Sequence, residues 1–122
     1  SIDSISKRIK KLSEKRIISF YNTEINYNLL GLEKYKLFIY TKGYSDEFEK
    51  NLFNFLRGKK NTLNIIRIIG QWKLEVEFLI EEYNVFQKIV SEMQEKFSEY
   101  ILKSDFSIFR NEVWFPSKNL LL

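Results

Sequence analysis

Residues 62–80, TLNIIRIIGQWKLEVEFLI, decide the fold. The run up to position 69 is mostly β-branched and apolar, and Gly70 and Gln71 then interrupt it. From Trp72 to Ile80 apolar side chains alternate with charged ones, and a period of two is the pattern of a half-buried strand. The stretch therefore predicts an antiparallel hairpin whose turn lies near Gly70.

Further strands and helices are predicted on both sides of this hairpin. Residues 34–41 alternate as a strand with bulky side chains on both faces, whereas residues 45–58 and 83–100 have apolar side chains at helical spacing. Ser45 is a candidate N-cap for the first of these helices. Residues 104–115 return to a strand pattern. The order predicts an α+β fold of the ferredoxin-like type, βαββαβ, with an antiparallel sheet and both helices on one face.

This arrangement leaves the second face of the sheet open. Phe38, Tyr40, Leu79 and Phe109 would add apolar groups to that face. Since soluble monomers rarely expose a large apolar patch, a second copy of the sheet is the simplest cover, and contact between identical surfaces is two-fold. We predict a dimer at least.

The N-terminal segment is the basic part of the chain. Ile2, Ile5, Ile9 and Leu12 recur at helical spacing, which predicts an amphipathic helix with an apolar stripe. Residues 1–20 contain two acidic and six basic side chains, a net charge of +4, and the remaining residues, with fourteen of each sign, sum to zero. The six basic side chains are Lys7, Arg8, Lys10, Lys11, Lys15 and Arg16. This asymmetry favours a local anionic partner over a protein that is basic all over.

The composition excludes several function classes. The 122 residues contain no Cys and no His, which removes disulfides and nearly every transition-metal ligand set. The sequence has no G-x-x-x-x-G-K-S/T phosphate loop and no G-x-G-x-x-G fingerprint, so an active site would have to consist of carboxylate, Lys and Tyr. It also has no apolar run of about 18 residues and no signal-peptide pattern. We expect a soluble, cytoplasmic protein that is not an enzyme, needs no cofactor and has no membrane partner.

Motifs along the chain resemble the Lrp/AsnC family of bacterial and archaeal transcription regulators. S-x-x-S-I-x-x-R-I-x-x-L-x-x-x-R-I-I at Ser1–Ile18 looks like the recognition helix and following strand of that family. LLG at Leu29–Gly31 and IIGQW at Ile68–Trp72 resemble its spacing before and inside a βαββαβ effector domain. The resemblance implies a division into the recognition helix and start of a strand from a partial winged helix-turn-helix (1–18), a linking strand (19–33), a ferredoxin-like effector and dimerisation domain (34–116) and a C-terminal tail (117–122).

By this resemblance residues 4–12 would lie in the major groove of double-stranded DNA, as the second helix of a helix-turn-helix that needs further helices before it. Family members read operators as homodimers and often assemble into tetramers or octamers. The implied DNA-binding residues are Ser4, Ser6, Lys7, Arg8, Lys10 and Lys11. From charge alone, a solvated helix face explains the basic side chains at least as well. Arg8 also has a competing structural role, and a serine is as often a cap as a base contact.

The family binds small effectors, commonly amino acids, between subunits near the turn that corresponds to Gly70, Gln71, Trp72 and Lys73. Many members have Asp where this sequence has Lys73, and a cation there would repel the ammonium group of an amino acid. Gly70 is also explained by a tight turn with positive φ, and Trp72 by core packing. The alternative is a ferredoxin-like small-molecule sensing or oligomerisation module that does not contact DNA itself.

Overall fold

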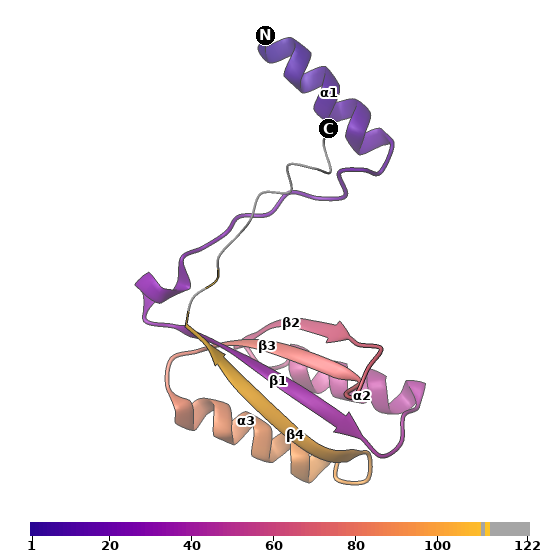
Figure 1. The fold of residues 1–122 in the computed structure, drawn as a ribbon, viewed down its shortest axis with the longest axis vertical. Helices are drawn as coiled ribbons and strands as arrows, with labels where there is room; N and C mark the ends of the chain where they lie inside the picture. The colour runs from indigo at the N-terminus through magenta and orange to yellow at the C-terminus, as the bar shows by residue number, and fades with distance from the viewer. Residues whose placement is uncertain (111, 113–122) are drawn as a thin grey trace.

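The computed structural model describes residues 1–110 and 112, and it consists of an N-terminal helix followed by a sheet-and-helix domain (Figure 1). In chain order the elements are α1 (Ile2–Glu14), the 3-10 helix η1 (Tyr27–Leu30), β1 (Glu33–Thr41), α2 (Asp46–Arg57), β2 (Thr62–Arg67), β3 (Leu74–Ile80), α3 (Tyr83–Lys96) and β4 (Ile101–Phe109). From β1 onward the order is βαββαβ, which confirms the predicted α+β, ferredoxin-like fold. Among the described residues, no helix has the length and apolar character needed to cross a membrane.

The sheet has the strand order β2-β3-β1-β4, and every pairing in it is antiparallel. The predicted hairpin is the β2–β3 pair, and Leu37 on the central strand β1 lies opposite Val76 on β3 and Phe106 on β4. Figure 1 shows α2 and α3 on the same side of this sheet. The opposite face carries no helix of the described chain, as the sequence predicts.

The core lies between the sheet and these two helices. Alternate residues of β1 and β3 point into it, and the apolar stripes of α2 and α3 close it from the other side. Its fully buried members include Leu37, Ile39, Phe48, Leu52, Val76, Phe78 and Met93. Burial of such a side chain stabilises the fold by about 1.5–3 kcal/mol, so this domain has the means to fold around its own core.

The C-terminal strand differs from the prediction at its start. β4 begins at Ile101 rather than at position 104, and α3 ends at Lys96. Residues 97–100 form a turn instead, in which the amides of Tyr100 and Ile101 both donate to the carbonyl of Phe97, at 3.0 and 2.9 Å, and β4 follows directly. β4 ends at Phe109, and residues 110 and 112 are described without strand structure, whereas 111, 113–115 and the tail at 117–122 lie outside the described residues.

The predicted linking strand over 19–33 is wrong as a strand. Residues 19–26 form no strand, η1 follows them, and regular β structure begins only at Glu33. The β-branched and aromatic side chains do favour extended backbone here, but a strand also needs a neighbour for its N–H and C=O groups. Within the described chain nothing pairs with this segment.

Candidate functional site

Helix α1 forms because its local signals agree. Ser1 is the N-cap, and its Oγ accepts a hydrogen bond from the Ser4 amide at 3.4 Å, while Asp3 lies in the positive first turn. At the other end the amide of Arg16 donates to the Ser13 carbonyl at 2.9 Å, and the Ile17 amide donates to the Leu12 carbonyl at 2.9 Å. These bonds close the last turn of the helix.

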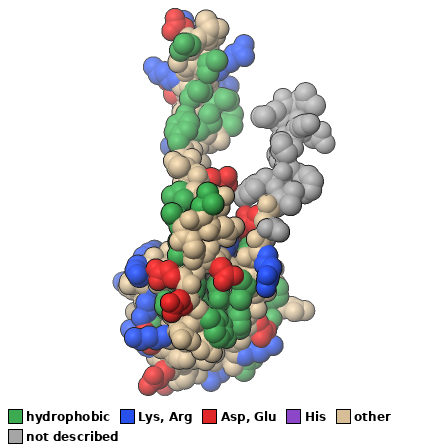
Figure 2. Space-filling view, turned by 90° about the vertical axis from the view of Figure 1, so that its left-hand side faces the viewer, with side chains coloured by type: hydrophobic (Ala, Val, Ile, Leu, Met, Phe, Trp, Pro, Cys, Tyr) green, Lys and Arg blue, Asp and Glu red, His purple; other side chains and the backbone are tan. Residues whose placement is uncertain are grey.

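The apolar stripe of α1 is uncovered. The helix contributes no buried residue, and the exposed fraction of the stripe runs from 82% at Ile2 to 37% at Leu12. Figure 1 shows α1 standing apart from the sheet, and Figure 2 shows hydrophobic side chains along it with Lys and Arg on either side. An amphipathic helix is stable in a protein when its apolar face is packed, so this stripe is a surface for another element.

The predicted DNA-binding residues are exposed on this helix, although not all lie on one face. The 3.6-residue period places Ser4, Lys7 and Lys11 in a row opposite the apolar stripe. Arg8 and Lys10 lie on either side of that row. Ser6 lies one helical turn before Lys10 on the same flank, about as close to the apolar stripe as Arg8 is on the other flank.

Lys15 continues this row and was missed in the predicted set. It follows Lys11 at the i+4 spacing and is the C-cap residue of α1. The spacing of Lys7, Lys11 and Lys15 was the available signal. Like charges at i and i+4 repel by about 0.2–0.5 kcal/mol, a cost that a bound anion would remove.

None of the basic side chains of residues 1–20 forms an ion pair within the described chain. All ion pairs there lie between residues 34 and 112, for example Lys36 with Glu75 at 3.1 Å and Arg67 with Glu49 at 2.5 Å. The cations of the sheet domain are thus partly neutralised inside it, whereas those of α1 face solvent. The net charge of +4 is thus available in residues 1–20, which comprise α1 and the segment that follows it.

The turn predicted to bind an effector is broader than expected. It spans residues 68–73 and is closed by the Ile68 amide donating to the Lys73 carbonyl at 2.8 Å. The expectation of positive φ at Gly70 is wrong, because a loop of this length spreads the chain reversal over several residues; the glycine with positive φ is Gly31, at 72°. Gly70, Gln71 and Lys73 are exposed and therefore accessible from solvent.

Trp72 belongs to the open face of the sheet. Its ring packs against Phe38 and Tyr40, with centroids 4.9 and 6.0 Å apart, and its Nε1 donates to Glu75 Oε1 at 3.0 Å. Trp72 is therefore a packing residue, as expected, but it is half-buried on the open face and does not belong to the core, so the predicted core position is wrong.

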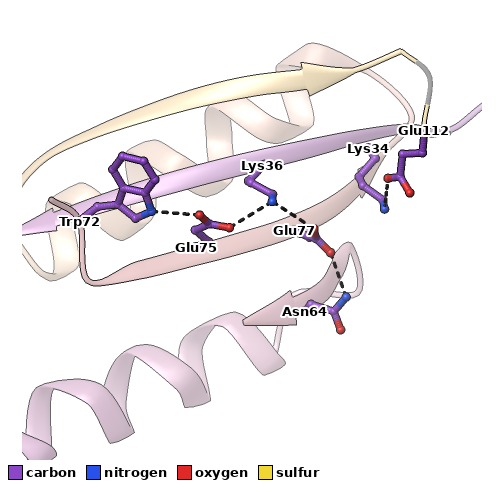
Figure 3. Close-up of polar contacts among 7 residues, drawn as sticks. All are labelled: Lys34, Lys36, Asn64, Trp72, Glu75, Glu77 and Glu112. Atoms are coloured by element: carbon purple, nitrogen blue, oxygen red, sulfur yellow. Dashed lines mark hydrogen bonds and ion pairs between the residues drawn. The ribbon is translucent and has the colours of Figure 1, made fainter. Parts of the chain in front are cut away.

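The open face also carries a polar network (Figure 3). Lys36 Nζ lies 3.1 Å from Glu75 and 3.6 Å from Glu77, and Asn64 Nδ2 donates to Glu77 Oε2 at 2.9 Å. Both carboxylates are buried, with 9% of each residue exposed. These acidic residues thus form cross-strand ion pairs with Lys36, and both carboxylates are engaged in them.

A groove between α3 and β4 has a volume of about 390 Å³, which is within the range of small-molecule sites. Its lining combines aromatic, aliphatic and neutral polar side chains, among them Phe86, Val90, Gln87 and Ser91. Gln94 Nε2 donates to Ser104 Oγ at 2.9 Å across it. The sequence does not predict this groove. Its walls come from separate segments, and each segment taken alone shows only the ordinary alternation of core and surface side chains.

Comparison with known proteins adds the relationship in fold. No protein-family model and no curated protein matches the sequence. Among solved structures, a transcriptional regulator of Neisseria meningitidis in complex with L-Met matches with a TM-score of 0.77 and 14% identity, over 100% of this chain and 80% of its own. AsnC of Escherichia coli matches with a TM-score of 0.72 and 15% identity, over 94% of this chain and 76% of its own. LrpC of Bacillus subtilis matches with a TM-score of 0.67 and 21% identity, over 93% of this chain and 76% of its own.

These identities are low, so the likeness is one of fold. It nonetheless extends beyond the sheet domain, since a match over 100% of the chain includes α1 and the linker. The resemblance seen in the sequence motifs agrees with this result. The chain has, over nearly its whole length, the fold of the Lrp/AsnC family of transcription regulators.

Proposed function

We propose that the protein is a sequence-specific, DNA-binding transcription regulator of the Lrp/AsnC type. The observation that carries the proposal is the helix α1, whose exposed cations have no counter-ions in the described chain and lie opposite an uncovered apolar stripe. A helix of this kind fits the major groove of B-DNA, which is about 12 Å wide. The likeness in fold to known regulators supports the same conclusion.

In this proposal the residues of α1 have three different roles: phosphate contact, base contact and packing on neighbouring helices. Lys7, Lys10 and Lys11 contact phosphates and supply affinity, with Arg8 beside them. Ser4, and less directly Ser6, lie near base edges and contribute to sequence discrimination. The apolar stripe packs on the other helices of a helix-turn-helix, which fixes α1 in the groove.

The sheet domain holds two copies together through its open face. Phe38, Tyr40, Leu79 and Phe109 lie on that face, on the opposite side from the core residues that alternate with them. A two-fold contact would cover them and seal the Lys36 network from water. Phe38→Glu should shift sedimentation of the chain from dimer to monomer; an unchanged assembly would remove this face from the interface. Tetramers or octamers would need a further surface.

A small effector would contact the turn at residues 70–73. The Neisseria regulator is in complex with L-Met, which shows that this fold accommodates an amino acid in that protein. Here Gln71 and Lys73 are exposed, and the cation of Lys73 favours an anionic group on the ligand. Lys73→Asp should therefore weaken binding of an anionic effector, and titration calorimetry with candidate acids measures it.

The main proposal is tested by DNA binding to the chain with Lys10→Glu and Lys11→Glu. The two reversals place negative charge against phosphates, so affinity for a duplex should fall by about 100-fold or more at low salt. Fluorescence anisotropy with a labelled duplex measures this. The matched control is Lys42→Glu with Lys88→Glu, which changes the net charge equally on exposed positions of the sheet domain. Equal losses in both variants would contradict a specific role for α1.

The second candidate function is a small-molecule sensing module without DNA contact. The groove between α3 and β4 favours it, because this groove lies entirely within the sheet domain. Under this function, deletion of residues 1–18 leaves ligand binding and assembly unchanged. Under the main proposal the same deletion abolishes duplex binding.

A further inference from the structure

The segment that ends α1 contains an unusual backbone conformation. Arg16 has φ 57°, and it is the one non-glycine residue with positive φ within the described chain. The conformation itself follows from the turn, because a helix often ends with a left-handed residue whose neighbours' amides bond back to the last carbonyls. Glycine or asparagine adopts it most easily, since a larger L side chain crowds the following carbonyl.

Nothing within the described chain compensates for arginine at this position. Arg16 is exposed, and its guanidinium forms no ion pair or hydrogen bond with the described residues. A cation at a helix C-terminus does interact favourably with the helix dipole, but Lys11 and Lys15 already supply this charge. An intramolecular role therefore does not explain the choice of arginine.

The position of Arg16 does suggest a role outside the chain. It directly follows Lys15, the C-cap, so it adds a further exposed cation at the C-terminal end of α1. The guanidinium group presents N–H donors in a planar fork that matches two oxygens of a phosphate.

We infer that Arg16 binds a phosphodiester group of the nucleic-acid backbone, as an anchor at the C-terminal end of α1. The inference rests on the proposed function and adds a residue outside the predicted DNA-binding set. Because the ligand is a phosphate and not a base, the interaction contributes affinity and salt dependence without sequence preference. On this inference, the cost of an arginine in the left-handed conformation is offset by a contact that Arg16 makes only in the complex with nucleic acid.

The test uses the chain with Arg16→Gly and Arg16→Asn, two residue types that tolerate positive φ and carry no charge. Duplex binding is measured by anisotropy across a range of salt, and helix content by circular dichroism. Both variants should keep or gain helix content, while the slope of log affinity against log salt falls by about 0.9 for each phosphate that is no longer neutralised. Arg16→Lys should retain most of the slope. Lys88→Gln, a control of equal charge change on α3, should leave the slope unchanged.

Three outcomes overturn the inference. The first is an unchanged slope in Arg16→Gly when Lys10→Glu with Lys11→Glu still weakens binding, which spares the proposed function and removes Arg16 alone. The second is a parallel loss of helix content and affinity, which would make Arg16 a residue that stabilises the helix. The third is a slope in Arg16→Lys as low as in Arg16→Gly. A wild-type chain that binds no duplex would overturn the proposed function together with this inference.

Discussion

Helices α1 and α2 are built by the same sequence devices and yet have opposite environments. Each begins at a serine N-cap whose Oγ accepts an amide hydrogen bond, and each has an apolar stripe at helical spacing. The stripe of α2 is buried, with Leu52 fully inaccessible, whereas that of α1 is exposed along its length. Local sequence therefore determines that a helix forms, and the neighbours of the helix determine whether it is core or binding surface.

The charges of the two helices show the same difference. Glu49 on α2 is held by Arg67 of β2 at 2.5 Å and also accepts a hydrogen bond from Tyr44. On α1, Asp3 and Glu14 form no ion pair within the described chain, and neither do the basic side chains. An ionic contact that is satisfied internally supports the fold, while one that is left open is available to a partner.

The largest expected effect is a difference in stability between substitutions in the apolar stripes of α2 and α1. Leu52→Ala should lower the free energy of unfolding of the sheet domain by about 3 kcal/mol, because it leaves a cavity in the core. Ile9→Ala on α1 should change it by less than about 0.5 kcal/mol, since the side chain packs against nothing in that domain. Urea unfolding followed by tryptophan fluorescence measures both. Comparable losses would show that α1 shares the core of the domain.

The next effect compares the two caps. Ser45→Ala should destabilise the sheet domain by about 1 kcal/mol, because the Phe48 amide loses its acceptor. Ser1→Ala removes the same kind of bond from α1, so it should lower helix content by far-UV circular dichroism without shifting the unfolding midpoint. A shift of that midpoint by Ser1→Ala as large as that by Ser45→Ala would contradict the separation of the two regions.

The smallest effect depends on pH. Hydrogen bonds from Arg67, and then from Tyr44, lower the pKa of Glu49 from its usual 4.5 to about 2. A lowered folded-state pKa means that Glu49 stabilises the fold above pH 4.5 and that this contribution is lost as the pH falls toward 2. Glu49→Gln should therefore be less stable than wild type at pH 6 and equally stable near pH 2. A difference that stays constant across this range would show that the Glu49 charge is not responsible.

Regular alternation and helical spacing made most of the sheet domain predictable. The pattern from Trp72 to Ile80 predicted β3 within two residues of its start, and Ser45 was correctly identified as the cap of α2. Residues 19–33 were not predictable in this way. Their β-branched and aromatic side chains favour extended backbone, but the partner that would make it a strand is not encoded locally.

The candidate site was predictable in part for the same reason. The cations and the apolar stripe of α1 follow from the spacing of residues 2–12, whereas the left-handed backbone at Arg16 depends on how the helix ends. The groove between α3 and β4 depends on how two segments distant in sequence pack. The spacing of residue types along one segment predicts which face of a helix is apolar or charged. A cavity between two segments can be found only in the packed structure.

The central claim is that the cations of α1 bind the polyanionic backbone while the sheet domain does not. It is tested most directly by the salt dependence of duplex binding for wild type and for Lys7→Gln, Lys10→Gln and Lys11→Gln combined. Removal of these three charges should reduce the slope of log affinity against log salt by about 2.7 per bound subunit, at roughly 0.9 per phosphate. An unchanged slope would contradict the claim, since the charges that meet DNA would then lie elsewhere.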